Sequence, residues 1–210
     1  MKQVVEIMRE IAARSLSHGE VDLVLGWQKG DFWWQSYPAF VERESEVNSL
    51  IWDLFCVPNL SKYLLEELQK RKRVAIFVKG CDSLAFNQML QDRRVVREKV
   101  VLYGIPCGRL VDPGKVERTG LDRNLLEVKR DGEKLLFVSA EYEKRAGAED
   151  YYYDKCLTCR FPTPVISDEL LGEAASFSPR DRFEGIKKLE KMKSDERFDY
   201  WARQFSRCIR

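Results

Sequence analysis

Two short apolar segments on either side of a helical stretch constrain the fold of this chain more than any other feature. Residues 74–78 and 100–105 are rich in β-branched residues and show no polar alternation. Segments of this kind are typical of strands buried on both faces of a parallel sheet. Between them, apolar residues recur at helical spacing. The sequence therefore predicts a βαβ unit over residues 73–106, with a right-handed crossover that places the two strands side by side.

A cysteine follows each of these predicted strands: Cys81 comes directly after the first and Cys107 after the second. In a parallel pair both turns lie at the carboxyl edge of the sheet, where open α/β sheets bind their ligands. Neighbouring strands are about 4.8 Å apart, so the two sulfur atoms can share one site. Cys81 also opens the helix, and we expect the helix dipole to lower the pKa of its thiol.

Cys156 and Cys159 form a second pair, in the segment KCLTCR. This spacing directs two sulfur atoms into one site, which is the usual half of a tetrahedral zinc site or a cubane cluster. A dithiol oxidoreductase carries the motif at a helix start after a strand, whereas Pro162 and Pro164 follow it here. The context favours a ligand loop.

The cysteine and histidine content, the net charge and the lack of a long apolar stretch exclude several classes of protein. Six cysteines without an export signal favour metal or redox roles over disulfides. The single histidine, His18, lies in a helix-ending segment and argues against a histidine-based hydrolase or zinc enzyme. The net charge of +2 gives no reason to expect a nucleic-acid partner. The charged N-terminus and the lack of a long apolar stretch predict a cytoplasmic protein without a membrane span.

The rest of the chain completes a mixed α/β fold, with a central partly parallel sheet, flanking helices and a helical C-terminal segment. We expect helices over residues 2–17, 45–52 and 60–69, a strand over 21–27 paired with a segment 32–41 broken at Pro38, and a hairpin of strands 125–129 and 134–138. Residues 141–154 read as a surface loop or lid.

The predicted domain division places an α/β domain at residues 1–177 and a helical segment at 178–210. Ser178 with Pro179 is a good helix start, and apolar residues mark a buried face of that helix: Phe183, Ile186, Leu189 and Met192. A last helix begins at Ser194 and is expected to bury Phe198, Trp201, Ala202 and Phe205.

Several segments together resemble the beta-subunit family of the coenzyme F420 hydrogenases and dehydrogenases. These are KVVLYGIPC at residues 99–107, the segment 155–173 that contains the second cysteine pair, VKGCD at 78–82, and Trp52 with Cys56, Asn59 and Leu60. The likeness is greatest to the iron–sulfur branch associated with heterodisulfide-reductase-type electron transfer. It covers roughly residues 20–210, and its specificity comes from the order and spacing of the motifs.

The resemblance implies a redox subunit that binds a [4Fe-4S] cluster, in some members with FAD, and passes electrons between partner subunits. Matched position by position, the ligands are Cys81, Cys107, Cys156 and Cys159, with Cys56 as a reserve near the site. The implied partners are heterodisulfide-reductase-like or hydrogenase-like subunits or a ferredoxin. The branch continues past a helix like that at 198–208 into a ferredoxin-type module whose first cluster cysteine would be Cys208. We expect the segment 178–210 to lead into such a module, absent or truncated in this sequence. We expect an oxidoreductase subunit rather than an independent enzyme, and we assign no catalytic residue.

The residues alone leave three functions open. The first is a cubane cluster held by the four thiolates, whose negative charge Lys79, Lys155 and Arg160 would offset. The second is a structural zinc site built from the same cysteines. The third is an FAD-binding oxidoreductase subunit without a cluster, in which the aromatic group Trp27, Trp33 and Trp34 could stack on the flavin. We favour the first, in part because of the family resemblance.

Overall fold

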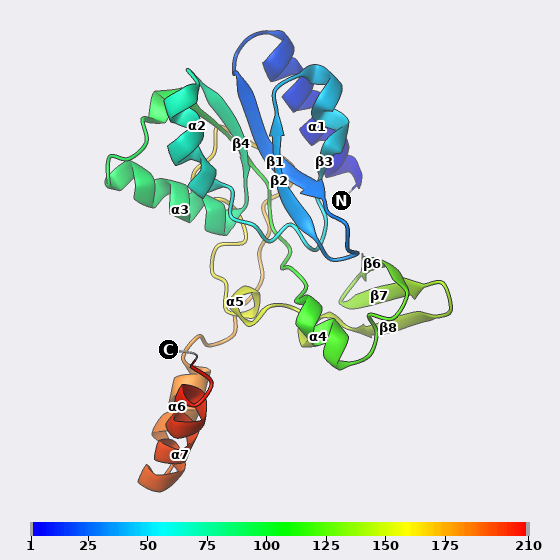
Figure 1. The fold of residues 1–210 in the computed structure, drawn as a ribbon, viewed down its shortest axis with the longest axis vertical. Coiled ribbons are helices and arrows are strands. Elements are labelled where there is room, and N and C mark those ends of the chain that lie inside the picture. The colour runs from blue at the N-terminus through cyan, green and yellow to red at the C-terminus, as the bar shows by residue number, and fades with distance from the viewer. Residues whose placement is uncertain (1, 209–210) are drawn as a thin grey trace. The chain divides into compact units, whose positions relative to one another are not determined.

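A six-stranded mixed sheet forms the framework of the larger of two units (Figure 1). The computed structural model describes residues 2–208, and the chain divides into the units Met1–Ser178 and Pro179–Arg210. In the described residues, the sheet has the order β2-β1-β4-β5-β9, with β3 also paired to β1. Its strands are β1 (Leu23–Lys29), β2 (Ser36–Val41), β3 (Leu50–Ile51), β4 (Val74–Val78), β5 (Val100–Gly104) and β9 (Glu169–Leu170). The four strands β1, β4, β5 and β9 are parallel, while β2 and β3 run antiparallel to β1.

The predicted βαβ unit is confirmed. Strands β4 and β5 pair in parallel from Val74↔Val100 to Val78↔Gly104, and helix α3 (Gly80–Gln91) connects them. All five residues of β4 are buried, because helices lie on both sides of the sheet: α1 (Lys2–Ser17) on one side, and α2 (Leu64–Lys70) with α3 on the other (Figure 1). The fold class is the mixed α/β class that the sequence predicts.

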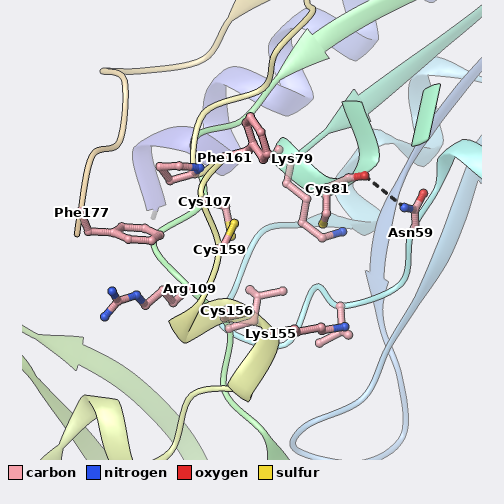
Figure 2. A pocket seen from close by; sticks show the side chains of 14 residues that line it. Asn59, Lys79, Cys81, Cys107, Arg109, Lys155, Cys156, Cys159, Phe161 and Phe177 are labelled. Carbon is pink, nitrogen blue, oxygen red and sulfur yellow. Dashed lines mark hydrogen bonds between the residues drawn. The ribbon is translucent and has the colours of Figure 1, made fainter. Parts of the chain in front are cut away.

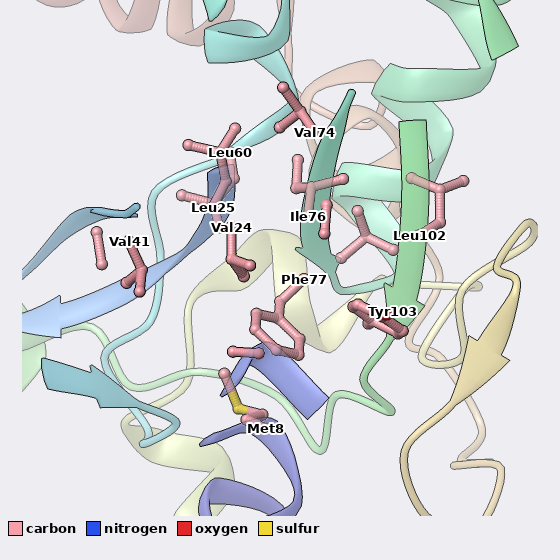
Figure 3. Close-up of a cluster of buried hydrophobic side chains, with 14 of the residues drawn as sticks. Met8, Val24, Leu25, Val41, Leu60, Val74, Ile76, Phe77, Leu102 and Tyr103 are labelled. Carbon is pink, nitrogen blue, oxygen red and sulfur yellow. The ribbon is translucent and has the colours of Figure 1, made fainter. Parts of the chain in front are cut away.

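The main hydrophobic core lies between this sheet and its helices. Figure 3 shows the ring of Phe77, on β4, pointing towards Met8 of α1; both side chains are fully buried. The rings of Phe77 and Tyr103, on the neighbouring strand β5, lie 5.6 Å apart. The Tyr103 hydroxyl and the buried Ser15 hydroxyl form a hydrogen bond of 2.7 Å, which connects β5 to the end of α1.

Replacing Tyr103 with phenylalanine should lower the free energy of unfolding by about 1–3 kcal/mol, because the buried Ser15 hydroxyl would lose its partner. Chemical denaturation of the full chain measures the change. The double variant Ser15→Ala, Tyr103→Phe should be less destabilised than the sum of the single variants, since neither position then leaves an unpaired hydroxyl. Strictly additive effects would show that the hydrogen bond contributes nothing.

A second, antiparallel sheet covers a separate core in the same unit. It consists of β6 (Leu125–Asp131), β7 (Lys134–Ser139) and β8 (Glu143–Gly147). The predicted hairpin is confirmed, and Gly132 adopts the positive φ of 60° that its turn requires. The prediction of a loop over 141–154 is wrong at β8. This strand pairs along the free edge of β7 through its backbone, and four of its five residues are exposed, so its sequence carries no apolar alternation.

Three smaller predictions are also wrong in detail. The segment predicted as a helix at 45–52 is a 3₁₀ helix (Glu44–Ser49) followed by β3, and helix 60–69 begins with a 3₁₀ turn (Ser61–Tyr63) before α2. The second strand begins at Ser36 and is not broken at Pro38. Proline fits there because β2 lies at the edge of the sheet, where one row of backbone donors has no partner strand.

The second unit contains helices α6 (Glu184–Glu190) and α7 (Ser194–Phe205). The final helix begins at Ser194 as predicted, but α6 begins six residues after Ser178. The prediction that α7 buries Phe198, Trp201, Ala202 and Phe205 is wrong, as all four are exposed; so are Phe183 and Ile186, while Leu189 and Met192 are half-buried. The physical reason is size: so short a pair of helices has too little surface to enclose a core of its own. Among the described residues, no helix combines the length and apolar character needed to cross a membrane.

Candidate functional site

One cavity, at the carboxyl ends of β4 and β5, is lined by four of the six cysteines (Figure 2). Its volume is about 210 Å³. Cys81 lies in the first turn of α3, directly after β4, and Cys107 follows β5. Cys156 lies in the short helix α5 (Asp154–Leu157), and Cys159 comes just after it. The sheet edge and a segment about fifty residues later thus supply two thiols each to the same space.

The segment that carries the second pair, residues 154–164, is called here the paired-thiol loop. Backbone contacts hold it directly against the sheet edge. The Cys107 backbone N–H donates a hydrogen bond of 2.7 Å to the carbonyl of Pro162. At Gly80 the approach is closer still, since a Cβ atom added there would lie only 1.7 Å from the carbonyl oxygen of Phe161. Only glycine permits so close a contact between the two backbones.

The other end of the paired-thiol loop is attached to the chain that follows β5. The Tyr153 backbone N–H donates to the carbonyl of Leu110 at 3.1 Å, and Val111 forms an isolated β-bridge with Tyr152. Helix α5 then starts with a hydrogen bond of 2.8 Å from the Cys156 N–H to the carbonyl of Tyr153. Both ends of the loop are therefore fixed by backbone hydrogen bonds, and the positions of its two cysteines do not depend on side-chain packing alone.

The cavity is also lined by positively charged side chains: Lys79, Arg109 and Lys155. Lys79 is 1% exposed and its ammonium group is held from several directions. It donates to Asp82 Oδ2 at 2.8 Å and to the carbonyl of Pro58 at 2.9 Å, and it lies 4.7 Å from the ring centre of Trp27. Arg109 pairs with Glu149 at 3.0 Å and stacks on Phe177. An anionic group bound among the thiols would meet positive charge on several sides.

Loss of hydration at the sulfur atom is the largest effect on the acidity of three of these thiols, although Cys81 is exposed and Cys107 and Cys156 are half-buried as whole residues. It raises the pKa of Cys81 and Cys156, and it raises the pKa of Cys107 to about 12. The nearby charge of Lys79 acts in the opposite direction on all three but is weaker than burial. The expectation of a lowered pKa at Cys81 is therefore wrong, because desolvation is the largest effect on this thiol and raises its pKa. Thiols in this state retain their protons until a metal cation displaces them, so binding would release protons.

The charged pair beside the thiols balances two opposing effects. Burial is the largest single effect and would lower the pKa of the Lys79 ammonium, but the charge and hydrogen bond of Asp82 together with the charges of Cys81 and Cys107 outweigh it. The pKa of Lys79 therefore lies above its ordinary value and the side chain stays charged. Burial raises the pKa of the Asp82 carboxyl, against the effect of Lys79.

The chemistry of this donor set fits an iron–sulfur cluster. Four cysteine sulfurs are the ligands that a [4Fe-4S] cluster requires, and they border one cavity with cationic side chains beside them. Within residues 2–208, no group of three or more histidine, cysteine, aspartate or glutamate side chains is arranged to hold a metal ion. The thiols are gathered around the cavity but do not form a closed cage.

The other two cysteines lie elsewhere. Cys56 is fully buried in the main core, where its sulfur accepts a hydrogen bond from the Asp53 N–H at 3.3 Å, and it does not line the cavity. Cys208 is exposed in the second unit. Trp27 is fully buried in the core, whereas Trp33 lines a separate cavity of about 570 Å³ together with Trp52 and Phe55.

Sequence reasoning missed Asp82 and Arg109 as neighbours of the thiols. The i,i+3 spacing of Lys79 and Asp82 across a helix start is a signal that could have identified this pair. Arg109 follows Cys107 by two residues but adopts a positive φ of 76°, and nothing in the sequence indicates that conformation. Arg160, expected near the site, is exposed and is not among the residues that line the cavity.

Comparison with known proteins finds curated relatives that are beta subunits of F420-dependent formate dehydrogenases. No protein-family model matches the chain. It is 29% identical over 98 residues to F420-dependent formate dehydrogenase 1 subunit beta from Methanococcus maripaludis, and 25% identical over 169 residues to F420-dependent formate dehydrogenase subunit beta from Methanocaldococcus jannaschii. These matches cover 47% and 72% of this chain, but only 25% and 44% of the relatives.

A solved structure shares the fold. A chain of the F420-reducing [NiFe] hydrogenase complex from Methanosarcina barkeri, determined with xenon, superposes with a TM-score of 0.60 at 14% identity. The match covers 75% of this chain and 62% of that one. The chain therefore spans less than half the length of the two curated relatives and less than two thirds of the solved chain.

Proposed function

Because this chain is related, at low sequence identity, to the beta-type subunits of F420 hydrogenases and dehydrogenases, we propose that it is an electron-transfer subunit holding one [4Fe-4S] cluster. The family resemblance indicated by the sequence motifs is confirmed by these relatives. The cluster itself is our inference, and the observation that carries it is the convergence of Cys81, Cys107, Cys156 and Cys159 on one cavity.

In this function the chain supplies the cysteine ligands of the cluster and the charged and apolar side chains that surround it. A cluster bound here would store one electron at a potential set by its charge, hydrogen bonds and solvent exposure. The four thiols would give up their protons and bind, and Phe161 and Phe177 form apolar parts of the cavity wall. Lys79 and Arg109 contribute positive charge close to the sulfur atoms. This function needs no proton transfer by a side chain, and we assign no catalytic residue.

The partners we propose are other redox subunits. The curated relatives are named as subunits of formate dehydrogenases, and the solved relative belongs to a hydrogenase complex. By analogy, this chain would exchange electrons with a hydrogenase-like or heterodisulfide-reductase-like subunit or with a ferredoxin. We assign no residue to F420 or to FAD.

Metal, sulfide and flavin analysis of the anaerobically purified chain tests the proposal directly. We expect a brown protein with about four iron and about four acid-labile sulfide per chain. Stoichiometric zinc in a colourless protein would replace the cluster with the structural zinc site. A yellow protein with releasable flavin and no iron would favour the flavin subunit, for which the cavity beside Trp33 and Trp52 is the place to look.

A further inference from the structure

We propose that Lys79 and Asp82 together set the reduction potential of the group bound at the four-cysteine cavity, with Lys79 as the dominant charge. This inference rests on the proposed function, because it requires a redox-active cluster at that site. Lys79 and Asp82 would act on the cluster through their charges and would not bind it themselves.

The pair is built into the wall of the site. The Lys79 and Asp82 side chains are 1% and 0% exposed, and Lys79 Nζ lies 2.8 Å from Asp82 Oδ2. The Asp82 carboxylate also accepts a hydrogen bond of 3.2 Å from the Lys79 backbone N–H, so it closes the first turn of the helix that carries Cys81. Charges in so dry an environment are weakly screened and act strongly on a neighbouring charged group.

The two charges do not cancel at the cavity. Lys79 lines it, whereas Asp82 is fully buried and is not among the lining residues. The wall of the cavity therefore presents net positive charge to whatever binds among the sulfur atoms.

A fixed positive charge favours the reduced state. Reduction adds one electron, taken from a redox partner in the complex or from dithionite in a titration, and so makes the bound cluster more negative by one charge. The Lys79 ammonium stabilises that added charge and raises the potential. The Asp82 carboxylate opposes it and also fixes the position of the ammonium through their hydrogen bond.

Two variants distinguish the effect of the Asp82 charge from that of the Lys79 charge, because they should shift the midpoint potential in opposite directions. Asp82→Asn keeps the size of the side chain and removes the negative charge, while the Lys79 ammonium keeps its hydrogen bond to the Pro58 carbonyl and its contact with the Trp27 ring. In a titration at mildly acidic pH, where Lys79 stays charged without its carboxylate partner, the midpoint potential should shift to a more positive value. The double variant Lys79→Met, Asp82→Asn removes both charges and should shift the potential to a more negative value than that of the unmodified protein, because Lys79 lines the cavity and Asp82 does not. The single variant Lys79→Met is avoided, since it would leave a buried carboxylate without its partner.

The measurement is a redox titration of the full chain with its cluster, followed by electron paramagnetic resonance, with iron content as a check on occupancy. Lys155→Met is the matched control: Lys155 also lines the cavity but is exposed, and solvent screens its charge, so its shift should be smaller than that of the double variant. Unchanged potentials in fully loaded Asp82→Asn and double variants would overturn the inference. An unmodified protein without iron and sulfide would instead overturn the proposed function.

Discussion

The variant Cys107→Ala is expected to lose the cluster entirely. Burial and backbone geometry make this position hard to replace: Cys107 follows the end of β5, and its own N–H is hydrogen bonded to Pro162 in the paired-thiol loop. Three thiols then remain around the cavity, and the buried Cys56 is held in the core by its contacts with Asp53. Iron and sulfide per chain should fall to background, with loss of the brown colour, when the variant is purified anaerobically.

Cys208→Ala provides the matched control for this experiment. Cys208 is exposed in the second unit, so its replacement should leave the iron and sulfide content unchanged. Retention of full iron content in Cys107→Ala would remove this residue from the ligand set. Loss of iron in Cys208→Ala would add a ligand that the cavity does not contain.

The variant Gly80→Ala should lose the cluster although all four cysteines remain. A methyl group at position 80 would lie 1.7 Å from the carbonyl oxygen and 2.8 Å from the carbonyl carbon of Phe161. Both atoms belong to the backbone, so no side-chain rotation can relieve the overlap. The paired-thiol loop must move away from the sheet edge, and Cys156 and Cys159 move with it. Iron content measures the loss, and faster proteolytic cleavage within residues 154–164 would report the displaced loop.

Gly185→Ala is the control for a glycine substitution as such. A Cβ atom at position 185 meets nothing within 4 Å, and the residue lies in helix α6. This variant should keep its iron and gain about 0.5–1 kcal/mol of local helix stability. If Gly80→Ala retained its full iron content and an intact loop, the close contact between the loop and α3 could not be a condition for binding.

Much of the framework follows from local sequence. The apolar runs of β4 and β5 predict buried parallel strands because both faces of these strands are covered, and the Asp-Gly turn predicts the hairpin of β6 and β7. The strand β8 could not be predicted in this way. It is added through backbone hydrogen bonds to an existing edge, and its mostly exposed side chains leave no periodic signal.

The candidate site was likewise predictable from local sequence only in part. The order of strand, cysteine and helix places Cys81 and Cys107 at one sheet edge, since parallel strands that pair side by side end together. The arrival of Cys156 and Cys159 at that edge depends on contacts between segments far apart in the sequence, such as the one between Gly80 and Phe161. No local pattern specifies a contact of that kind.

Sequence by itself determined the buried strands β4 and β5, the hairpin of β6 and β7, and which turns carry cysteines, because periodicity and turn chemistry act over a few neighbouring residues. Only the tertiary structure decided how deeply those thiols are buried, which charge faces them, and which apolar residues remain exposed. Burial raises the pKa of Cys81 despite its position at a helix start, and the apolar side chains of α7 stay in solvent because no layer in their own unit covers them. Desolvation and packing are properties of the assembled fold, since both depend on residues brought together from across the chain.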